Sequence, residues 1–177
     1  YYFKQSAGGR MVVGWNKIDG KLYYMKPNGE TTMNAWLTEG DIKYYFKSTG
    51  EMAVGSALID GKLYFFNKNG KLSTTKGWNT YGGKYYYMGS DGFLKTGWMT
   101  LDGNTYYLLP ATGERASGVQ KVDGKLYFFD ESTGAQVTTA GWVKAGDASY
   151  YLNKKGIVQV GWKKISGSMD YFLKNDG

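Results

Sequence analysis

The side chains of this sequence with the clearest potential for molecular recognition are tryptophans, which recur together with pairs of other aromatics. Gly-Trp or a recognisable substitute comes every 20 to 23 residues, at Trp15, Trp36, Ser56, Trp78, Trp98, Val119, Trp142 and Trp162. Eight residues after each of the first seven positions stands an aromatic doublet: Tyr23-Tyr24, Tyr44-Tyr45, Tyr64-Phe65, Tyr86-Tyr87, Tyr106-Tyr107, Tyr127-Phe128 and Tyr150-Tyr151. An exposed Trp beside a Tyr hydroxyl offers an apolar face and a hydrogen bond to a sugar ring, and such π faces also attract cations. The pattern predicts aromatic binding surfaces in an array of about eight repeats.

The same sequence argues against catalysis. It contains no His and no Cys, so the usual general bases, thiol nucleophiles and most transition-metal ligands are missing. Its repeated turn carboxylates have a structural explanation, whereas glycoside hydrolysis needs two carboxylates in a cleft. We therefore expect a noncatalytic module with no catalytic residue, no metal and no cofactor.

Each repeat has the signature of a β-hairpin. Between the Trp position and the doublet comes a pair of turn residues, successively Asp19-Gly20, Gly40-Asp41, Asp60-Gly61, Gly82-Gly83, Asp102-Gly103, Asp123-Gly124 and Gly146-Asp147. These dipeptides supply the positive φ that two-residue type I′ and II′ loops require. A further Gly after the second strand marks the turn toward the next repeat. The predicted fold class is all-β, with residues 1–177 forming a single array of about eight stacked hairpins.

A two-residue loop also determines which side chains face each other across the hairpin. With Asp19-Gly20 at the tip, Trp15 opposes Tyr24. The same register predicts the pairs Trp36 with Tyr45, Trp78 with Tyr87, Trp98 with Tyr107 and Trp142 with Tyr151. The last repeat looks one residue longer, because Tyr171-Phe172 comes nine residues after Trp162, and we expect a disturbed register there.

The first aromatic of each doublet is present even in the repeats that lack Trp. We therefore predict that these residues form the interior ladder of the array: Tyr23, Tyr44, Tyr64, Tyr86, Tyr106, Tyr127 and Tyr150. Met25 and Met88 fall on the same face, two residues later, and are predicted to fill the core.

Two repeats lack Trp, and they lie 63 residues apart at Ser56 and Val119. In both, a Phe (Phe65 or Phe128) replaces the Tyr that would face the Trp. A loss that returns every third hairpin predicts a β-solenoid with about three hairpins per superhelical turn. Because solenoid symmetry gives no reason to omit a core residue on one side alone, the pattern favours a ligand role for the Trp residues.

Composition limits the classes of partner. The net charge of +7 is scattered, which is typical of a solvated surface; no basic stripe favours nucleic acid, and a weak attraction to an anionic polymer such as teichoic acid stays open. No apolar run reaches the length of a membrane span, and the first residues are no signal peptide. Residues 1–6 match residues 44–49 in mid-repeat, and Gly177 falls on a repeat boundary. We therefore expect a fragment of a longer protein.

The combination of Gly-Trp, a variable strand, Asp-Gly-Lys, Tyr-Tyr-Phe and Asn-x-x-Gly resembles the choline-binding and cell-wall-binding repeats of Gram-positive surface proteins. It equally resembles the glucan-binding repeats of glucansucrases and the C-terminal repeats of large clostridial toxins. The resemblance covers essentially all 177 residues. It implies a β-solenoid with about three hairpins per turn, a secreted or cell-surface location, and noncatalytic attachment to a cell wall or glycan.

The resemblance also implies a cage in choline-binding members, formed by the Trp of Gly-Trp, a further Trp just before the doublet, and a Tyr of the next repeat. Here the position before the doublet holds Leu22, Lys43, Leu63, Tyr85, Thr105, Leu126, Ser149 and Asp170. Losing one aromatic wall weakens the attraction to a quaternary ammonium, since each face contributes about 0.5 to 2 kcal/mol. This departure brings the chain closer to the glucan-binding and toxin-type repeats.

We therefore predict multivalent binding confined to the Trp-bearing repeats. The candidate ligand-binding residues are Trp15, Tyr24, Trp36, Tyr45, Trp78, Tyr87, Trp98, Tyr107, Trp142, Tyr151 and Trp162, with each site completed by a residue of the adjoining hairpin. The expected partners are cell-wall polysaccharide, glucan or choline-bearing teichoic acid, and further domains of the same chain. Two alternatives stay open: a module that recognises choline-decorated teichoic acids, and a passive spacer or protein-docking array.

Overall fold

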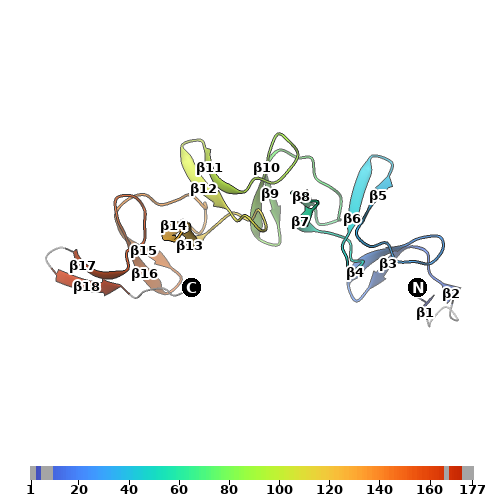
Figure 1. Ribbon diagram of the computed structural model, residues 1–177, viewed down its shortest axis with the longest axis horizontal. Coiled ribbons are helices and arrows are strands. Elements are labelled where there is room, and N and C mark those ends of the chain that lie inside the picture. Colours follow the sequence, from blue (N-terminus) through green and yellow to red (C-terminus); the bar gives the residue numbers. More distant parts are fainter. Residues whose placement is uncertain (1–2, 5–9, 166–167, 173–177) are drawn as a thin grey trace. The chain divides into compact units, whose positions relative to one another are not determined.

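The computed structural model describes residues 3–4, 10–165 and 168–172 (Figure 1). The expected mid-repeat start over residues 1–6 falls mostly outside this range, and so does the expected repeat boundary at Gly177. Within the described range, no helix is long and apolar enough to cross a membrane. The chain divides into two compact units, one of residues 1–95 and 111–113 and the other of residues 96–110 and 114–177.

Each unit consists of two-stranded antiparallel sheets that follow one another along the chain. The first unit holds β1 (Phe3–Lys4) with β2 (Arg10–Met11), then hairpin 1 of β3 (Gly14–Ile18) and β4 (Lys21–Met25), hairpin 2 of β5 (Ala35–Glu39) and β6 (Ile42–Phe46), hairpin 3 of β7 (Gly55–Ile59) and β8 (Lys62–Phe66), and hairpin 4 of β9 (Gly77–Tyr81) and β10 (Lys84–Met88). The second unit holds hairpin 5 of β11 (Gly97–Leu101) and β12 (Asn104–Leu108), hairpin 6 of β13 (Gly118–Val122) and β14 (Lys125–Phe129), hairpin 7 of β15 (Gly141–Ala145) and β16 (Ala148–Leu152), and hairpin 8 of β17 (Gly161–Ile165) and β18 (Ser168–Phe172). The described residues thus confirm an all-β array of eight repeat hairpins.

The hairpin tips have the two loop types that the sequence predicts. In hairpin 1, Asp19 and Gly20 both have positive φ, 49° and 81°, as a type I′ turn requires. In hairpin 2 the Gly comes first, and of the two loop residues only Gly40 has positive φ, at 58°, as in a type II′ turn. The order of the dipeptide therefore selects the turn type.

The predicted strand register is confirmed in hairpins 1 to 7, where every Trp position faces the second residue of its doublet. The expectation for the last repeat is wrong. Trp162 is paired with Tyr171 and Gly161 with Phe172, which is the same register as in the other hairpins. No residue is inserted, because Asp170 occupies the first doublet position and Phe172 the position after the doublet. The expected insertion came from aligning the consecutive aromatics Tyr171-Phe172 with the doublets of the other repeats, which is one residue too far along the chain.

The most deeply buried side chains form a ladder at the residue after each doublet. All are at most 1% exposed: Met25, Phe46, Phe66, Met88, Leu108, Phe129 and Leu152. Their cross-strand neighbours are Gly in six hairpins and Ala in one, at Ala35. Because the facing residue is so small, a large side chain fits there and is covered by neighbouring repeats, and burying it stabilises the fold by about 1.5 to 3 kcal/mol. The prediction that Met25 and Met88 fill the core is confirmed.

Within each unit, backbone hydrogen bonds tie a hairpin to the connection that follows the next one. In the first unit the amide N–H of Met52 donates to the carbonyl of Leu22 at 2.8 Å, and Leu72 donates to Lys43 at the same distance. In the second unit Gln136 donates to Thr105 at 2.7 Å and Val158 to Leu126 at 2.8 Å. These bonds repeat at equivalent positions, so within each unit they impose a similar relation between successive repeats.

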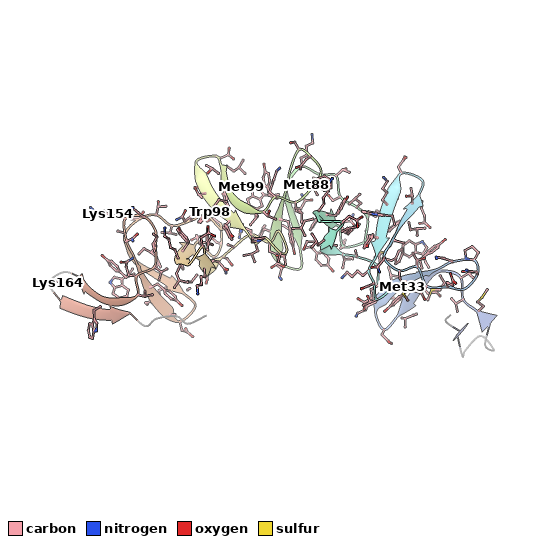
Figure 2. The ribbon with its side chains drawn as sticks, viewed as in Figure 1. Met33, Met88, Trp98, Met99, Lys154 and Lys164 are labelled. Atoms are coloured by element: carbon pink, nitrogen blue, oxygen red, sulfur yellow. The ribbon has the colours of Figure 1, made fainter. Side chains whose placement is uncertain are left out.

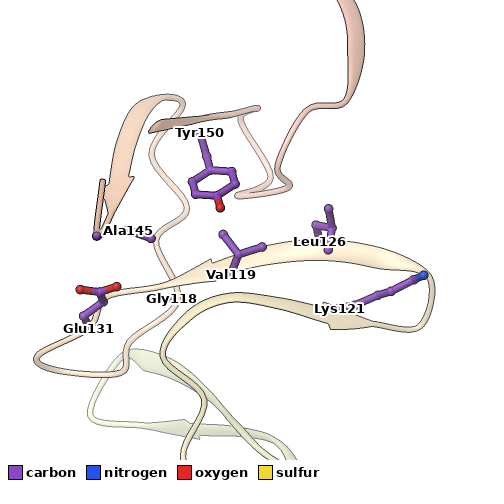
Figure 3. Close-up of a pocket in the computed structure, with 8 residues that line it drawn as sticks. Gly118, Val119, Lys121, Leu126, Glu131, Ala145 and Tyr150 are labelled. Atoms are coloured by element: carbon purple, nitrogen blue, oxygen red, sulfur yellow. The ribbon is translucent and has the colours of Figure 1, made fainter. Parts of the chain in front are cut away.

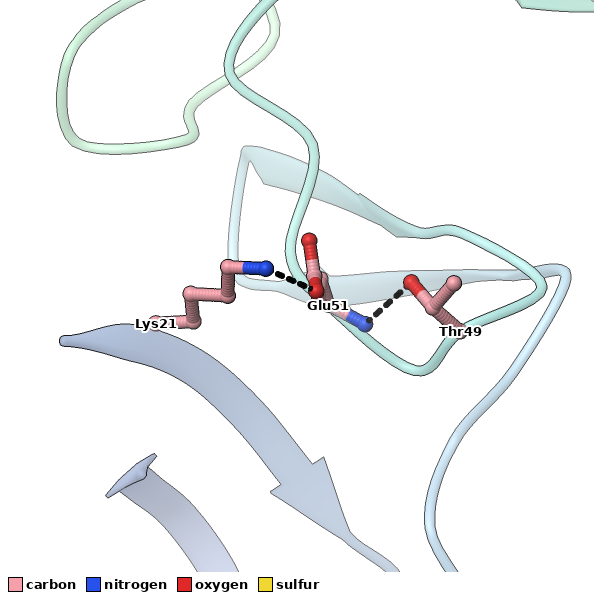
Figure 4. Close-up of polar contacts among 3 residues, drawn as sticks. All are labelled: Lys21, Thr49 and Glu51. Atoms are coloured by element: carbon pink, nitrogen blue, oxygen red, sulfur yellow. Dashed lines mark hydrogen bonds and ion pairs between the residues drawn. The ribbon is translucent and has the colours of Figure 1, made fainter. Parts of the chain in front are cut away.

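One ion pair reinforces this link between hairpin 1 and the connection after hairpin 2. Lys21, at the start of β4, donates to the carboxylate of Glu51, whose own backbone N–H donates to the Thr49 hydroxyl at 3.5 Å (Figure 4). The hydrogen bond that Lys21 donates to the Glu51 carboxylate raises the pKa of Lys21 above its ordinary value. The pair lies beside the bond from Met52 to Leu22 and is exposed, so we assign it a local positioning role.

Candidate functional site

The indole rings of Trp15, Trp36 and Trp98 contact not only their own hairpin but also the next one. In hairpin 1, the Trp15 ring lies edge-on to Tyr24 of the same hairpin, with centroids 5.4 Å apart. It also lies 4.8 Å from Tyr44 and 5.6 Å from Phe46, both in hairpin 2. The face of hairpin 1 that carries Trp15 and Tyr24 thus packs against the face of hairpin 2 that carries Tyr44 and Phe46. These two residues share a face because alternate residues of a strand point to the same side.

The same arrangement recurs in both units. Trp36 lies 5.2 Å from Tyr45 of its own hairpin, and 5.1 Å from Tyr64 and 5.9 Å from Phe66 of the next. In the second unit, Trp98 repeats it with Tyr107 at 5.1 Å, Tyr127 at 5.0 Å and Phe129 at 5.8 Å. We call each set of one Trp, its facing Tyr and the first doublet Tyr of the next hairpin a three-ring site.

Two further predicted pairs are also confirmed as ring contacts. Trp78 lies 5.2 Å from Tyr87, and Trp142 lies 5.4 Å from Tyr151. Trp162 faces Tyr171 across the strands of hairpin 8, although the side chain of Tyr171 lies outside the described residues. The ten residues of the five predicted Trp–Tyr pairs therefore lie at the predicted register, and Trp162 lies in the regular register where a disturbed one was expected. The role of all eleven candidate residues toward a ligand stays a prediction.

The Trp side chains combine packing with exposure. Trp15, Trp36, Trp98, Trp142 and Trp162 expose 36%, 37%, 42%, 57% and 65% of their surface, and Trp78 is half-buried. Figure 2 labels Trp98 on β11. A Trp that packs on a buried Phe and still exposes a third or more of its surface can offer part of its ring to a ligand without leaving the core.

The first doublet residues are placed differently from the predicted interior ladder. Tyr44 and Tyr86 are buried, but Tyr23, Tyr64, Tyr106, Tyr127 and Tyr150 are only half-buried. The fully buried ladder lies two residues further on, and Tyr44, Tyr64 and Tyr127 instead supply the third ring of a three-ring site. The sequence indicates that this position matters, since a Tyr occupies it in each of the first seven repeats. Periodicity alone does not reveal which ring of a neighbouring hairpin they contact.

Polar groups accompany two of the three-ring sites and differ between them. A groove of about 290 Å³ at the second site is lined by Trp36, Thr38, Lys43, Tyr64 and Leu72. At the first site, the indole N–H of Trp15 donates to the carboxylate of Glu39 in hairpin 2, at 3.0 Å. An ammonium group therefore lines one site and a carboxylate lies at the other, and sequence reasoning assigned neither group a role.

In hairpin 3, which lacks Trp, a buried apolar contact takes the place of a three-ring site. The Phe65 and Tyr86 rings lie 5.1 Å apart, and they are 2% and 3% exposed. Together with Leu63, Met88 and Leu94 they form a buried cluster against which Tyr81 packs. The joint change of Trp to Ser56 and of Tyr to Phe65 thus accompanies an apolar contact between hairpins in place of an exposed site.

The turn after hairpin 6 is organised by one carboxylate. Oδ1 of Asp130 accepts from the backbone N–H of Thr133 at 2.7 Å, and from the hydroxyls of Ser132 and Thr133 at 2.7 and 2.8 Å. These donors stabilise the ionised form, the backbone N–H of Thr133 most, and lower the pKa of Asp130 from 3.8 to about 2.

This shift predicts a turn that loosens only in strong acid. Because the folded pKa lies below the ordinary value, the stabilisation is complete above pH 3.8 and is lost as the pH falls through about 2. A ¹³C carboxyl titration of Asp130 should have its midpoint near pH 2, and amide exchange at Thr133 should accelerate below it. Asp130→Asn should exchange faster at neutral pH and show no such transition. A midpoint at or above 3.8 would contradict the assignment.

Two repeat families match the sequence. The model of the cell wall binding repeat matches residues 13–30, 34–52, 76–92, 140–157 and 160–177, and that of the choline-binding repeat matches residues 95–140. The first model alone matches 90 of the 177 residues, which is half of the chain. Comparison with curated proteins gives no match.

Solved structures of pneumococcal proteins are similar. The structure of CbpJ from Streptococcus pneumoniae is 25% identical over 97% of this chain and 60% of its own length, with a TM-score of 0.50. Choline binding protein F from the same species, solved with a peptidoglycan analogue, is 32% identical over 85% of this chain and 48% of its own, with a TM-score of 0.47. An alternansucrase solved with isomaltononaose is 25% identical over 95% of this chain and 15% of its own, with a TM-score of 0.48.

The chain thus spans 60% and 48% of the first two of these structures. The matched segments include every Trp-bearing hairpin, and the structure arranges them as the repeated hairpins that the CbpJ similarity also indicates. By its sequence motifs and its fold, this chain belongs to the family of choline-binding and cell wall binding repeats.

Proposed function

We propose that this chain is a noncatalytic module that attaches a secreted surface protein to cell-wall glycan through several shallow aromatic sites. Its repeats associate it with the cell wall or cell surface. The observation that carries the proposal is the three-ring site, which recurs with nearly the same centroid distances at Trp15, Trp36 and Trp98. We further propose that the hairpins wind as a solenoid with about three per turn, which would present Trp-bearing hairpins along one polymer.

The groove at Trp36 supports a glycan as the ligand. The Trp36 and Tyr64 rings offer apolar surface to the C–H face of a sugar, while Thr38 and Lys43 can form hydrogen bonds with its hydroxyl groups. The Lys43 ammonium would repel a quaternary ammonium in the same groove. A hydroxylated, neutral or acidic polymer therefore suits this site better than choline does.

Choline-bearing teichoic acid is the second candidate, and the site at Trp15 favours it. Three aromatic rings, Trp15, Tyr24 and Tyr44, lie there beside the Glu39 carboxylate. A carboxylate next to π faces adds a charge attraction to the cation–π contact. Different hairpins would then bind different parts of one decorated polymer.

The test is a titration followed at the individual indole N–H signals of the six Trp residues by NMR, with dextran, purified Gram-positive cell wall and choline as ligands. Glycan binding should shift the Trp36 and Trp98 signals with saturation, whereas choline should act mainly at Trp15. Glu39→Gln should weaken the choline response and leave the glycan response of Trp36 unchanged, so it serves as a matched control.

If no indole signal responds to any of the three ligands, the binding proposal is wrong. The chain would then be a passive spacer or a protein-docking array.

A further inference from the structure

The two Trp-less hairpins, 3 and 6, differ in what the following hairpin places against them. In both cases the relevant residue is the last of its first strand, which is Tyr81 in β9 and Ala145 in β15. The tyrosine is large and the alanine is small. The consequences are visible within each unit separately.

At hairpin 3 the tyrosine closes the space. A Cβ atom on Gly55 would lie 2.8 Å from Cδ1 of Tyr81, so the ring lies directly over this glycine, and it also packs against the buried cluster around Phe65. A recess of about 420 Å³ exists nearby, lined by Lys68, Thr80, Tyr81, Gly82, Gly83 and Tyr85. Neither Ser56 nor Leu63 lines it; Leu63 is buried and Ser56 is half-buried.

At hairpin 6, Ala145 also packs against a buried cluster, of Phe128, Leu152 and Val158, but its small side chain leaves a space beside this contact. A pocket of about 460 Å³ lies there, within the range of about 300 to 1,000 Å³ usual for small-molecule sites. Its lining is Gly118, Val119, Lys121, Leu126, Glu131, Ala145, Gly146 and Tyr150. Figure 3 shows Val119 directed from hairpin 6 toward Tyr150, Leu126 farther along the same hairpin, Glu131 at the left, and Lys121 extended toward the hairpin tip at the right. The pocket thus has an apolar centre with polar groups around it.

Glu131, whose carboxylate lines this pocket, belongs to a turn with a hydrogen-bonded backbone. Glu131 follows Asp130, whose hydrogen bonds to Ser132 and Thr133 fix the backbone here, and Arg115 donates to the carbonyl oxygens of Ser132 and Thr133. Oε1 of Glu131 lies 3.6 Å from the position a Cβ on Gly118 would take. Within the part of the chain that the structure describes, Glu131 and Lys121 form no ion pair, so both remain available to a ligand.

We propose that this pocket is a second kind of binding site, for a single neutral pyranose unit of a glycan. The C–H face of the sugar would lie on Val119 and Leu126. Its hydroxyls would donate to the Glu131 carboxylate, and the Tyr150 hydroxyl can donate to them or accept from them. A quaternary ammonium lacks a ring cage here, since Tyr150 is the one aromatic lining residue, and a phosphate would be repelled by Glu131.

This site departs from the expectation that binding is confined to the Trp-bearing repeats. It is also independent of the three-ring sites, because no Trp lines it. Both Trp-less hairpins thus form a buried apolar contact with the next hairpin, and at hairpin 6 a pocket with an apolar centre and polar groups around it lies beside that contact.

The experiment is an NMR titration of the full chain with ¹³C-labelled methyl groups, using isomaltotriose and a chitin trisaccharide as separate ligands. The methyl signals of Val119 and Leu126 report on the pocket, and the Trp indole signals report on the three-ring sites. At least one of the two saccharides should shift both methyl signals with saturation. Glu131→Gln should weaken this binding on the order of tenfold, because it removes a hydrogen bond to a charged acceptor.

The decisive variant is Ala145→Tyr, which should fill the pocket as Tyr81 covers hairpin 3 and abolish the methyl shifts. Ser149→Tyr is the matched control, since Ser149 is exposed, does not line the pocket and, as the next residue after Ala148 in β16, points to the face opposite Ala145. It should bind like the original chain.

The proposal is overturned if neither saccharide shifts the methyl signals, if the shifts persist in Ala145→Tyr, or if choline alone produces them. An indole response without a methyl response would support the proposed function and refute the pocket. The reverse result would refute the three-ring sites alone.

Discussion

Replacing Trp36, Trp98 and Trp142 together by Leu is expected to lower retention of the chain on purified Gram-positive cell wall by a factor on the order of 10² to 10⁴. Each substitution removes one π platform, and avidity makes the losses multiply when several sites engage one polymer. Leu keeps apolar contact with the buried ladder, for example with Phe66 beneath Trp36. The measurement is the dissociation constant on cell-wall particles, with single, double and triple variants compared.

The matched control replaces three other exposed apolar residues, Met33, Leu58 and Val160, which are 52%, 65% and 41% exposed. The triple change of these residues to Ala should leave retention unchanged, and so should Ser56→Ala. If the Trp triple variant is retained as strongly as the control, the sites do not carry the attachment.

Phe66→Ala is expected to reduce the free energy of unfolding by about 3 to 5 kcal/mol. The side chain is fully buried at the end of β8, faces Gly55 across the hairpin and lies 5.9 Å from the Trp36 ring. Nothing on the facing strand can fill the cavity, because Gly55 has no side chain. Urea denaturation followed by circular dichroism measures the loss.

Two neighbours of this change serve as controls. Phe66→Leu should cost less than about 1.5 kcal/mol, since Leu108 and Leu152 occupy the equivalent position in the second unit. Leu58→Ala on β7 of the same hairpin, 65% exposed, should stay within about 0.5 kcal/mol. A loss below 1 kcal/mol for Phe66→Ala, measured in the same way, would show that the ladder does not hold the repeat together.

Most of the fold was accessible from the sequence because its determinants are local. Dipeptides such as Asp19-Gly20 set the turn type, and the turn sets the register that places Trp15 opposite Tyr24. The one register error, at Trp162, came from choosing Tyr171-Phe172 as the doublet by residue type. Strand pairing places Asp170 and Tyr171 there instead.

The burial of individual side chains was harder to predict, because the alternation along a strand shows which face a side chain lies on but not how deeply it is buried. Tyr44 and Phe46 share a face of β6, and their order of burial depends on where the next repeat covers the strand. Only the packed hairpins show that Phe46 is the covered residue and that Tyr44 meets Trp15. The third ring of each site was for the same reason outside the reach of spacing arguments.

The sequence by itself determined the hairpins, their register and the Trp–Tyr pairs, since each depends on residues within about a dozen positions of one another. The tertiary structure decided the contacts between hairpins. It determined which Tyr completes each three-ring site, and it placed the Glu39 carboxylate at one site and the Lys43 ammonium at another. It also placed the Tyr81 ring over Gly55 in one Trp-less hairpin, whereas the smaller Ala145 lines a pocket at the other. These contacts depend on the volume and charge of single side chains at positions that the repeat leaves variable. A periodic pattern describes the positions that the repeats share, and it does not specify the contacts made at positions where they differ.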